Sequence, residues 1–266
     1  MSKLNFSVFT KPWKTMPMEN LAQLVCDMGF DAIEFPLREG FQIQPSDGAA
    51  GLLKLCSVMK SFGLKVTSIA GNASGDVDES LFAGCGEAGI KIIRICDYVH
   101  RNISFFENLD ILRRKYDAII PWCEKYNVTL GVQMHCGDSI TNAAETYILL
   151  KDYDPRRIAA VWDSGHSGLA GNTPQFAIDI VYDKLCMVNF KAAYRERVNP
   201  FEEIARWQEH WTTGKNGCGS WSEAAAHLKK RGYNGTVCLP AEYSDEENVE
   251  TYAREDLAYI KRLFGC

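Results

Sequence analysis

The strongest constraint on the fold of this chain is a regular alternation of short apolar runs with longer amphipathic segments. The short runs are rich in Val, Ile and Phe, as buried β-strands are, and helical periodicity separates each run from the next. The pattern predicts eight strands, over Leu4–Thr10, Ala32–Pro36, Lys65–Ala70, Lys91–Cys96, Val128–Met134, Ile158–Trp162, Leu185–Lys191 and Thr236–Leu239.

The joints between helices and strands repeat one pattern. A Gly followed by an apolar residue precedes three of the strands, at Gly29, Gly89 and Gly232. Gly at this position ends a helix, and such repetition is expected when one βα unit is used several times. Pro121 predicts a kink in the longest helix or its division into two. Helices are predicted over Met18–Met28, Asp47–Gly63, Asp78–Ala88, Phe105–Tyr126, Ala143–Lys151, Thr173–Tyr182, Ser220–Arg231 and Glu246–Phe264.

Eight βα units within 266 residues predict an α/β protein with a single domain over residues 1–266, folded as a (β/α)8 TIM barrel. A doubly wound open sheet is the alternative that the same alternation allows. No GxGxxG or GxxxxGK[ST] sequence is present, so nucleotide binding through such loops has no support. The longest irregular connection is Ala192–Gly219, and Phe201–His210 within it is a candidate for an extra helix over the barrel mouth.

Composition excludes several classes of partner. A net charge of −5 argues against nucleic-acid binding, because no strong basic field is available to displace phosphate counterions. No apolar run approaches the ~20 residues needed to cross a membrane, and residues 1–20 lack a signal-peptide core. Ten Cys without CxxC or CxxH spacing are typical of buried thiols in a reducing cytoplasm, which is the location we expect.

Polar residues at the strand ends are the candidates for function, because the carboxyl ends of barrel strands face one cavity. The sixth expected strand ends in Asp163-Ser164-Gly165-His166, which directs a carboxylate and an imidazole toward that cavity. The alternative is that Asp163 caps the turn and His166 only hydrogen-bonds locally. Glu242 follows the eighth strand and, taken alone, is typical of a solvated turn residue.

Several segments together indicate a family. They are Asp163–His166 with Ala170-Gly171, Gly217–Gly219, and Gly232–Gly235 through Glu242. On these segments, and over nearly its whole length, the chain resembles the xylose-isomerase-like barrel superfamily. That superfamily includes ketose 3-epimerases, inosose dehydratases and hydroxypyruvate isomerases. The DSGHSGLAG sequence and Gln133-Met134-His135 most resemble the inosose dehydratase branch.

The resemblance implies a metal site. Members of the superfamily hold one divalent ion, often Mn²⁺, Co²⁺ or Mg²⁺, with Glu, Asp, His and Glu from strands five to eight. The matching positions here are Gln133, Asp163, Asn189 and Glu242. Two neutral amides in place of Glu and His leave an all-oxygen set with two negative charges, which favours hard ions over Zn²⁺. We therefore expect a weakened site for a divalent metal.

The resemblance also implies proton transfer next to the carbonyl of a sugar, keto-sugar or cyclitol. Glu242 is the expected base, and His166 or His135 the expected acid. Gln133 cannot accept a proton from carbon, so a 3-epimerase with two bases is hard to support. The function expected is that of an isomerase, epimerase or dehydratase.

The superfamily pattern supplies further candidates. Lys191 matches a family lysine, and we expect it to neutralise a substrate oxyanion. Arg195 occupies the spacing of a substrate-binding Arg, and Arg197 is an equal candidate by spacing alone. His135 either contacts substrate or orients a ligand. Trp13 either walls the sugar pocket or packs a loop.

Glu34 and two Trp residues have structural roles as alternatives. Glu34, at the end of strand two, more often forms structural hydrogen bonds in this fold than takes part in catalysis. Trp207 and Trp211 either cover the barrel mouth or bury an oligomer contact.

Two other functions remain open at this level. A catalytically degenerate barrel that binds a sugar-like ligand without turnover is the alternative that the Gln133 and Asn189 replacements allow. A DNA-repair endonuclease shares the superfamily fold, but that class needs a His-rich cluster of three metals, and this chain has five His in total. Substrate identity and a homo-oligomeric state are both left open.

Overall fold

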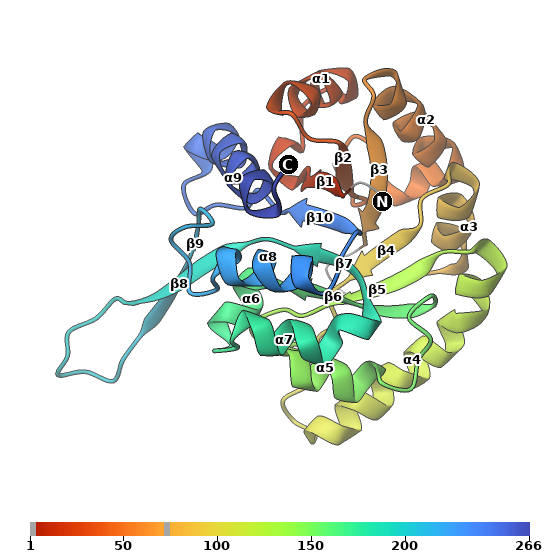
Figure 1. The fold of residues 1–266 in the computed structure, drawn as a ribbon. Helices are drawn as coiled ribbons and strands as arrows, with labels where there is room; N and C mark the ends of the chain where they lie inside the picture. Colours follow the sequence, from red (N-terminus) through yellow and green to blue (C-terminus); the bar gives the residue numbers. More distant parts are fainter. Residues whose placement is uncertain (1–3, 72–74) are drawn as a thin grey trace.

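The eight predicted strands close into a parallel barrel in the order β1-β10-β7-β6-β5-β4-β3-β2 (Figure 1). The computed structural model describes residues 4–71 and 75–266. The predicted TIM barrel is thus confirmed, and the open sheet is wrong. The strands are β1 (Asn5–Phe9), β2 (Ala32–Pro36), β3 (Lys65–Ala70), β4 (Ile92–Ile95), β5 (Thr129–Gln133), β6 (Ile158–Asp163), β7 (Leu185–Asn189) and β10 (Thr236–Leu239).

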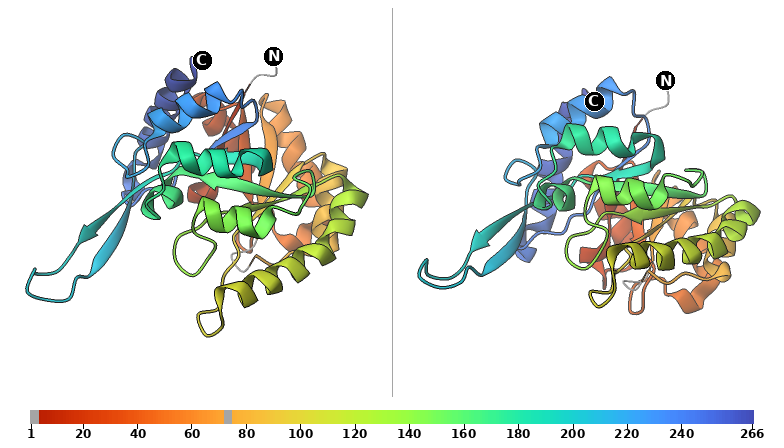
Figure 2. Two further views of the ribbon diagram at one scale, coloured as in Figure 1. Left: turned by 60° about the horizontal axis from the view of Figure 1, so that its bottom comes forward. Right: turned by 90° about the horizontal axis from the view of Figure 1, so that it is seen from below.

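Helices surround the barrel (Figure 2). Gly29 and Gly89 end two of them with left-handed φ values of 90° and 75°, as their position after a helix predicts. Pro121 lies inside one continuous helix, so the predicted division does not occur. The helices are α1 (Met18–Met28), α2 (Gly48–Ser61), α3 (Glu79–Ala88), α4 (Phe105–Tyr126), α5 (Ala143–Leu150), α6 (Ser164–Leu169), α7 (Pro174–Val181), α8 (Trp221–Lys230) and α9 (Val249–Phe264). Short 3-10 turns lie at η1 (Lys11–Trp13), η2 (Pro45–Asp47), η3 (Tyr182–Lys184) and η4 (Glu246–Asn248).

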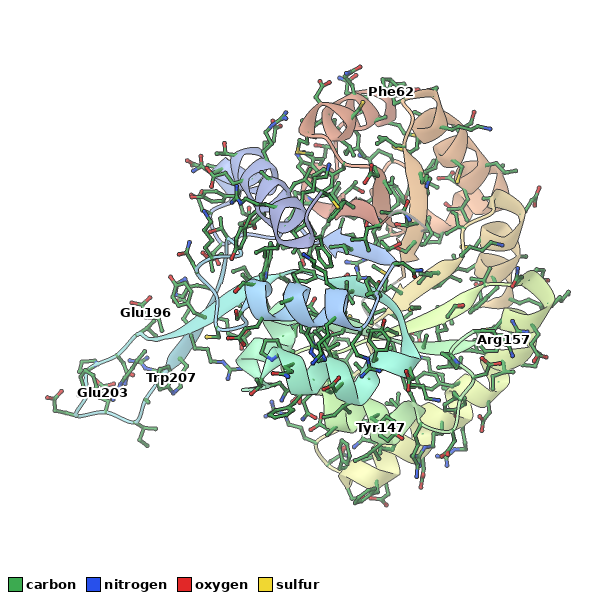
Figure 3. All side chains as sticks on the ribbon, viewed as in Figure 1. Phe62, Tyr147, Arg157, Glu196, Glu203 and Trp207 are labelled. Carbon is green, nitrogen blue, oxygen red and sulfur yellow. The ribbon has the colours of Figure 1, made fainter. Side chains whose placement is uncertain are left out.

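The connection between β7 and α8 forms an antiparallel hairpin, not an irregular loop. Its strands, β8 (Ala192–Arg197) and β9 (Trp207–Thr212), project away from the barrel (Figures 1 and 2). Glu196, Glu203 and Trp207 all lie on this arm (Figure 3). The helix expected over Phe201–His210 is wrong, because cross-strand contacts outweigh its weak helical signal.

Polar residues are built into the barrel interior. Glu34 on β2, Ser68 on β3 and Arg94 on β4 are all buried, and the Glu34 carboxylate accepts hydrogen bonds from both other side chains. This agrees with the structural role expected for Glu34. A small apolar cluster of Phe9, Ala70, Val161, Met187 and Cys238 is also present. Within the described ranges, no helix is both long enough and apolar enough to cross a membrane.

Candidate active site

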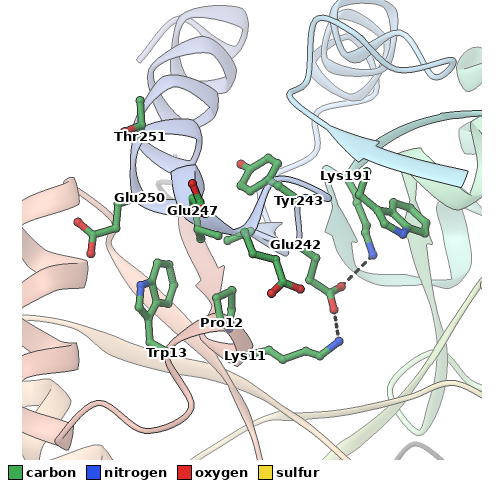
Figure 4. A pocket seen from close by; sticks show the side chains of 13 residues that line it. Lys11, Pro12, Trp13, Lys191, Glu242, Tyr243, Glu247, Glu250 and Thr251 are labelled. Atoms are coloured by element: carbon green, nitrogen blue, oxygen red, sulfur yellow. Dashed lines mark hydrogen bonds and ion pairs between the residues drawn. The ribbon is translucent and has the colours of Figure 1, made fainter.

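Two cavities lie at the carboxyl ends of the barrel strands, and Lys11 and Glu242 line both of them. The outer cavity, of about 790 Å³, is also lined by Trp13, Lys191 and Trp211 (Figure 4). The inner cavity, of about 180 Å³, is small for a ligand site. Its lining residues are Phe9, Lys11, Arg38, Gly71, Arg94, Ile95, Cys96, Tyr98, Gln133, His135, His166, Asn189, Pro240 and Glu242.

Glu242 is the carboxylate at the junction of the two cavities. Its Oε2 accepts a hydrogen bond from Lys191 Nζ at 2.8 Å, and its Oε1 pairs with Lys11 Nζ (Figure 4). The preceding residue, Ala241, has an uncommon left-handed φ of 52°, which is the kind of local strain that accompanies functional positions. Burial raises the pKa of Glu242, but Lys191 and Lys11 outweigh it and lower this pKa from 4.5 to about 2. Glu242 is therefore ionised, with both oxygens engaged.

Lys191 is held in place by the segment that carries the DSGH sequence. The Ser164 hydroxyl donates to the Lys191 carbonyl at 2.5 Å and accepts from the Lys191 backbone N–H at 2.9 Å. A Cβ at Gly165 would lie 3.1 Å from the same carbonyl, so Gly permits this close approach. The ammonium group lies 3.6 Å from the centre of the Trp211 ring, a cation–π contact that fixes its direction.

Two of the other three expected metal ligands, Asp163 and Gln133, belong to a network of hydrogen bonds. Asp163 Oδ1 accepts from the backbone N–H groups of Gly165 and His166, at 3.0 and 3.1 Å, so Asp163 does cap α6. Its Oδ2 accepts from Gln133 Nε2 at 2.7 Å. Gln133 Oε1 in turn accepts from Arg94 Nη1. Burial raises the pKa of Asp163.

A divalent ion does not fit this arrangement. Among the four expected ligands, only Asn189 Oδ1 is buried without a hydrogen-bond partner in the described part of the chain. Both Glu242 oxygens face ammonium groups, and the Gln133 oxygen faces Arg94. An ion would have to displace these cations, whose charge already balances Asp163 and Glu242. The weakened metal site stays a prediction.

His135 and His166 pack against each other at the inner cavity, with ring centroids 4.1 Å apart and the ring planes tilted by 34°. His166 Nδ1 accepts the backbone N–H of Cys136 at 3.1 Å, which places the His166 proton on Nε2. Burial, and then Lys191 and His135, lower the pKa of His166 well below its ordinary value, so the ring is neutral. His166 therefore offers an N–H donor.

The ligand atoms of His135, Cys136 and His166 all lie within 4.8 Å of one another, which is compatible with a soft metal. Their hydrogen bonds oppose it. His166 Nδ1 is occupied and Nε2 carries the proton, so the ring has no free lone pair. Burial raises the pKa of the Cys136 thiol to about 11, so an ion would have to release the thiol proton on binding. These three residues therefore do not form a ready metal site.

The remaining predicted residues lie further out. Arg195 forms an ion pair of 2.9 Å with Glu209 across the hairpin and donates a hydrogen bond to the Leu169 carbonyl. It is absent from the described linings of the inner and outer cavities. Trp211 reaches the outer cavity, whereas Trp207 is 62% exposed on the arm. Trp13 lines the outer cavity and is also part of the hydrophobic core, so its role in binding a sugar stays a prediction.

A model of the xylose isomerase-like TIM barrel family matches residues 22–263. The chain belongs to this family.

Several known proteins are similar to this chain. An inosose dehydratase of Mesomycoplasma hyopneumoniae is 23% identical over 168 residues, covering 60% of this chain and 55% of the relative. The chain thus spans about half the length of the curated relatives it matches. A xylose isomerase-like TIM barrel protein from Mycobacterium smegmatis in complex with magnesium has a TM-score of 0.74 and 14% identity, covering 99% of this chain and 98% of that one. A 3-keto-D-glucoside 4-epimerase from E. coli has a TM-score of 0.72 and 13% identity, covering 98% and 100%.

The sequence pattern did not predict three basic residues that line the inner cavity. Lys11 follows β1, Arg38 follows β2 and Arg94 lies on β4, so each is at or near the carboxyl end of a strand. The strand-end rule that selected Glu242 would have found them if it had been applied to cations in the first half of the barrel.

The two ammonium groups on Glu242 predict a pH dependence of stability. The pKa of Glu242 is lower in the folded protein than its ordinary 4.5, so its contribution to the free energy of unfolding is complete above pH 4.5. That contribution is lost as the pH falls from 4.5 toward about 2. The stability difference between wild type and Glu242→Gln should therefore narrow over this range, as measured by urea unfolding. A difference that stays constant would show that the ammonium groups do not stabilise the carboxylate.

Proposed function

We propose that this protein is an enzyme that moves a proton at a carbon next to a carbonyl group, in a small sugar, keto-sugar or cyclitol. The outcome of the reaction is isomerisation, epimerisation or dehydration. The observation that carries the proposal is Glu242, an ionised carboxylate held between Lys11 and Lys191 where the two cavities meet. The activities of the relatives support the same class of reaction.

Glu242 is the proposed base and Lys191 the group that stabilises the oxyanion. A substrate carbonyl oxygen that accepts a hydrogen bond from Lys191 Nζ draws this ammonium away from Glu242 Oε2. The freed carboxylate then becomes more basic and takes the proton from the neighbouring carbon. The electron pair of the C–H bond forms a carbon–carbon double bond, the π electron pair of the carbonyl moves to its oxygen, and the positive charge of Lys191 stabilises the resulting enolate.

The second half of the reaction either returns a proton to carbon or releases water. Glu242 can return the proton to carbon. Alternatively, it can pass the proton to a hydroxyl group on the next carbon, which leaves as water while the enolate becomes a carbonyl again and a new carbon–carbon double bond forms. His166 Nε2–H is a hydrogen-bond donor that would assist the departing hydroxyl. Gln133 cannot serve as a base on an opposite face, which favours one-base chemistry, and therefore dehydration or isomerisation, over two-base epimerisation.

A divalent metal remains a prediction for this site. Relatives of the same fold include one in complex with magnesium, and the buried Asn189 Oδ1 is an oxygen that could contact an ion. The steps above use only side chains of this chain, and the assay below is therefore run both with a chelator and with added Mn²⁺.

Hydrogen exchange tests the proposal directly. The protein is incubated in D2O with a panel of ketohexoses and inososes, and ¹H NMR follows the hydrogens on carbons next to the carbonyl. Enzyme-dependent loss of such a signal, with or without a new product, is the expected result. An absence of exchange across the panel, under both metal conditions, would contradict the proposal for these substrates.

One observation favours a second function, namely ligand binding without turnover. Both oxygens of Glu242 are neutralised by ammonium groups, and a carboxylate in that state is a poor base. If a compound of the panel raises the melting temperature but shows no exchange, this second function gains support.

A further inference from the structure

The inner cavity is unusually basic for a site that would receive an uncharged sugar. Lys11, Arg38 and Arg94 line it, and Glu242 is the one acidic residue of its described lining. The outer cavity differs, because Glu246, Glu247 and Glu250 line it together with Glu242. Positive charge is therefore concentrated deep in the barrel mouth.

Two of the three cations have protein partners. The Arg94 guanidinium forms two hydrogen bonds of 2.8 Å with the carboxylate of Glu34. Lys11 shares the carboxylate of Glu242 with Lys191. The positive charges of Arg94 and Lys11 are therefore each paired with a carboxylate of the protein.

Arg38 has no such partner. Its Nε donates to the Gly71 carbonyl at 3.1 Å, and its guanidinium lies 6.0 Å from the centre of the Phe9 ring. Its two terminal amino groups have no hydrogen-bond acceptor among the described residues, although the side chain is only partly exposed and lines the cavity. A guanidinium with both amino groups available is suited to a planar anion.

The charged side chains in and around the inner cavity have a net positive charge. Four cations, Lys11, Arg38, Arg94 and Lys191, meet three carboxylates, Glu34, Asp163 and Glu242. One negative charge on a ligand would balance the site.

We propose that the substrate carries an anionic group, either a carboxylate or a phosphate monoester, and that Arg38 and Lys11 bind this group in the inner cavity. The identity of the ligand as a substrate rests on the proposed function. Binding of an anion in the inner cavity does not depend on turnover and can be tested by itself. It also has a catalytic consequence. An anion that pairs with Lys11 draws this ammonium from Glu242 Oε1, just as the carbonyl draws Lys191 from Oε2, so that binding itself makes the base stronger.

Three ketoses that share a carbon skeleton and differ in the group at carbon 6 test the proposal: D-fructose, D-fructuronate and D-fructose 6-phosphate. Their dissociation constants are measured with the wild-type protein by isothermal titration calorimetry. At least one charged ketose should bind ~10-fold or more tightly than D-fructose, in line with hydrogen bonds to charged groups. Tighter binding of the fructuronate assigns a carboxylate, and tighter binding of the phosphate ester assigns a phosphate. Equal binding of all three would overturn the proposal.

Variants locate the site. Arg38→Gln should weaken binding of the charged ketose ~10-fold or more and leave D-fructose unaffected. The matched control is Arg114→Gln, which removes the same charge from an exposed position on α4. Circular dichroism checks that both variants fold. Unchanged affinity in folded Arg38→Gln, or an equal loss in Arg114→Gln, would overturn the proposal.

The outcomes separate this inference from the proposed function. A charged ketose that binds through Arg38 without exchanging its carbon-bound hydrogens supports the anion site and contradicts turnover of that compound. Exchange on D-fructose without any preference for the charged ketoses supports the enzyme and overturns the anion site.

Discussion

Replacing Glu242 with Gln is expected to slow carbon–hydrogen exchange by ~10²–10⁴-fold, the usual contribution of a general base. The amide has nearly the shape of the carboxylate and still offers an oxygen to Lys11 or Lys191, but it cannot accept a proton from carbon. Initial rates of deuterium incorporation, followed by NMR with a compound that the wild type exchanges, measure the effect.

The matched control for Glu242→Gln is Glu202→Gln. Glu202 is exposed on the projecting hairpin and lies away from both cavities, so the same change of charge there should leave the rate unaltered. If Glu242→Gln retained the wild-type rate, another group would have to be the base. An equal loss in both variants would show that the effect is one of net charge.

The barrel was predictable because its signals are local and repeated. The range Met18–Met28 agrees with the structure residue for residue, because an apolar stripe and a closing Gly define that helix. The hairpin was not predictable in the same way. Its stability depends on pairs such as Tyr194 with His210 and Arg195 with Glu209, which are far apart in the sequence.

The candidate site was predicted in its composition but not in its contacts. Position in the chain identified Asp163, Lys191 and Glu242 as residues of the barrel mouth. It did not show that Lys11, from the other end of the chain, pairs with Glu242. It also did not show that Arg94 binds the amide of Gln133. The first pairing depends on how the barrel closes, because β1 lies next to β10 only in the folded protein, whereas the second depends on the register between β4 and β5.

The ion pair between Glu34 and Arg94 is expected to be the most sensitive polar contact of the fold. Glu34 is 0% exposed and Arg94 is 7% exposed, and Ser68 donates a further hydrogen bond to Glu34 at 3.0 Å. Glu34→Gln leaves the guanidinium buried without a counter-charge, which should lower the free energy of unfolding by about 3–5 kcal/mol. Urea unfolding, followed by circular dichroism, measures this loss.

A surface pair and a double variant make the Glu34 prediction specific. Glu79→Gln breaks the exposed ion pair with Lys125 and should cost far less stability than Glu34→Gln, because water screens exposed pairs. Adding Arg94→Met to Glu34→Gln removes the unpaired charge, so the double variant should be less destabilised than the sum of the two single variants. Strict additivity, or a cost for Glu34→Gln as small as that for Glu79→Gln, would mean that water reaches Arg94 and screens its charge. In that case the inner cavity would be more hydrated than its contacts indicate, and Arg94 would hold the Gln133 amide less firmly.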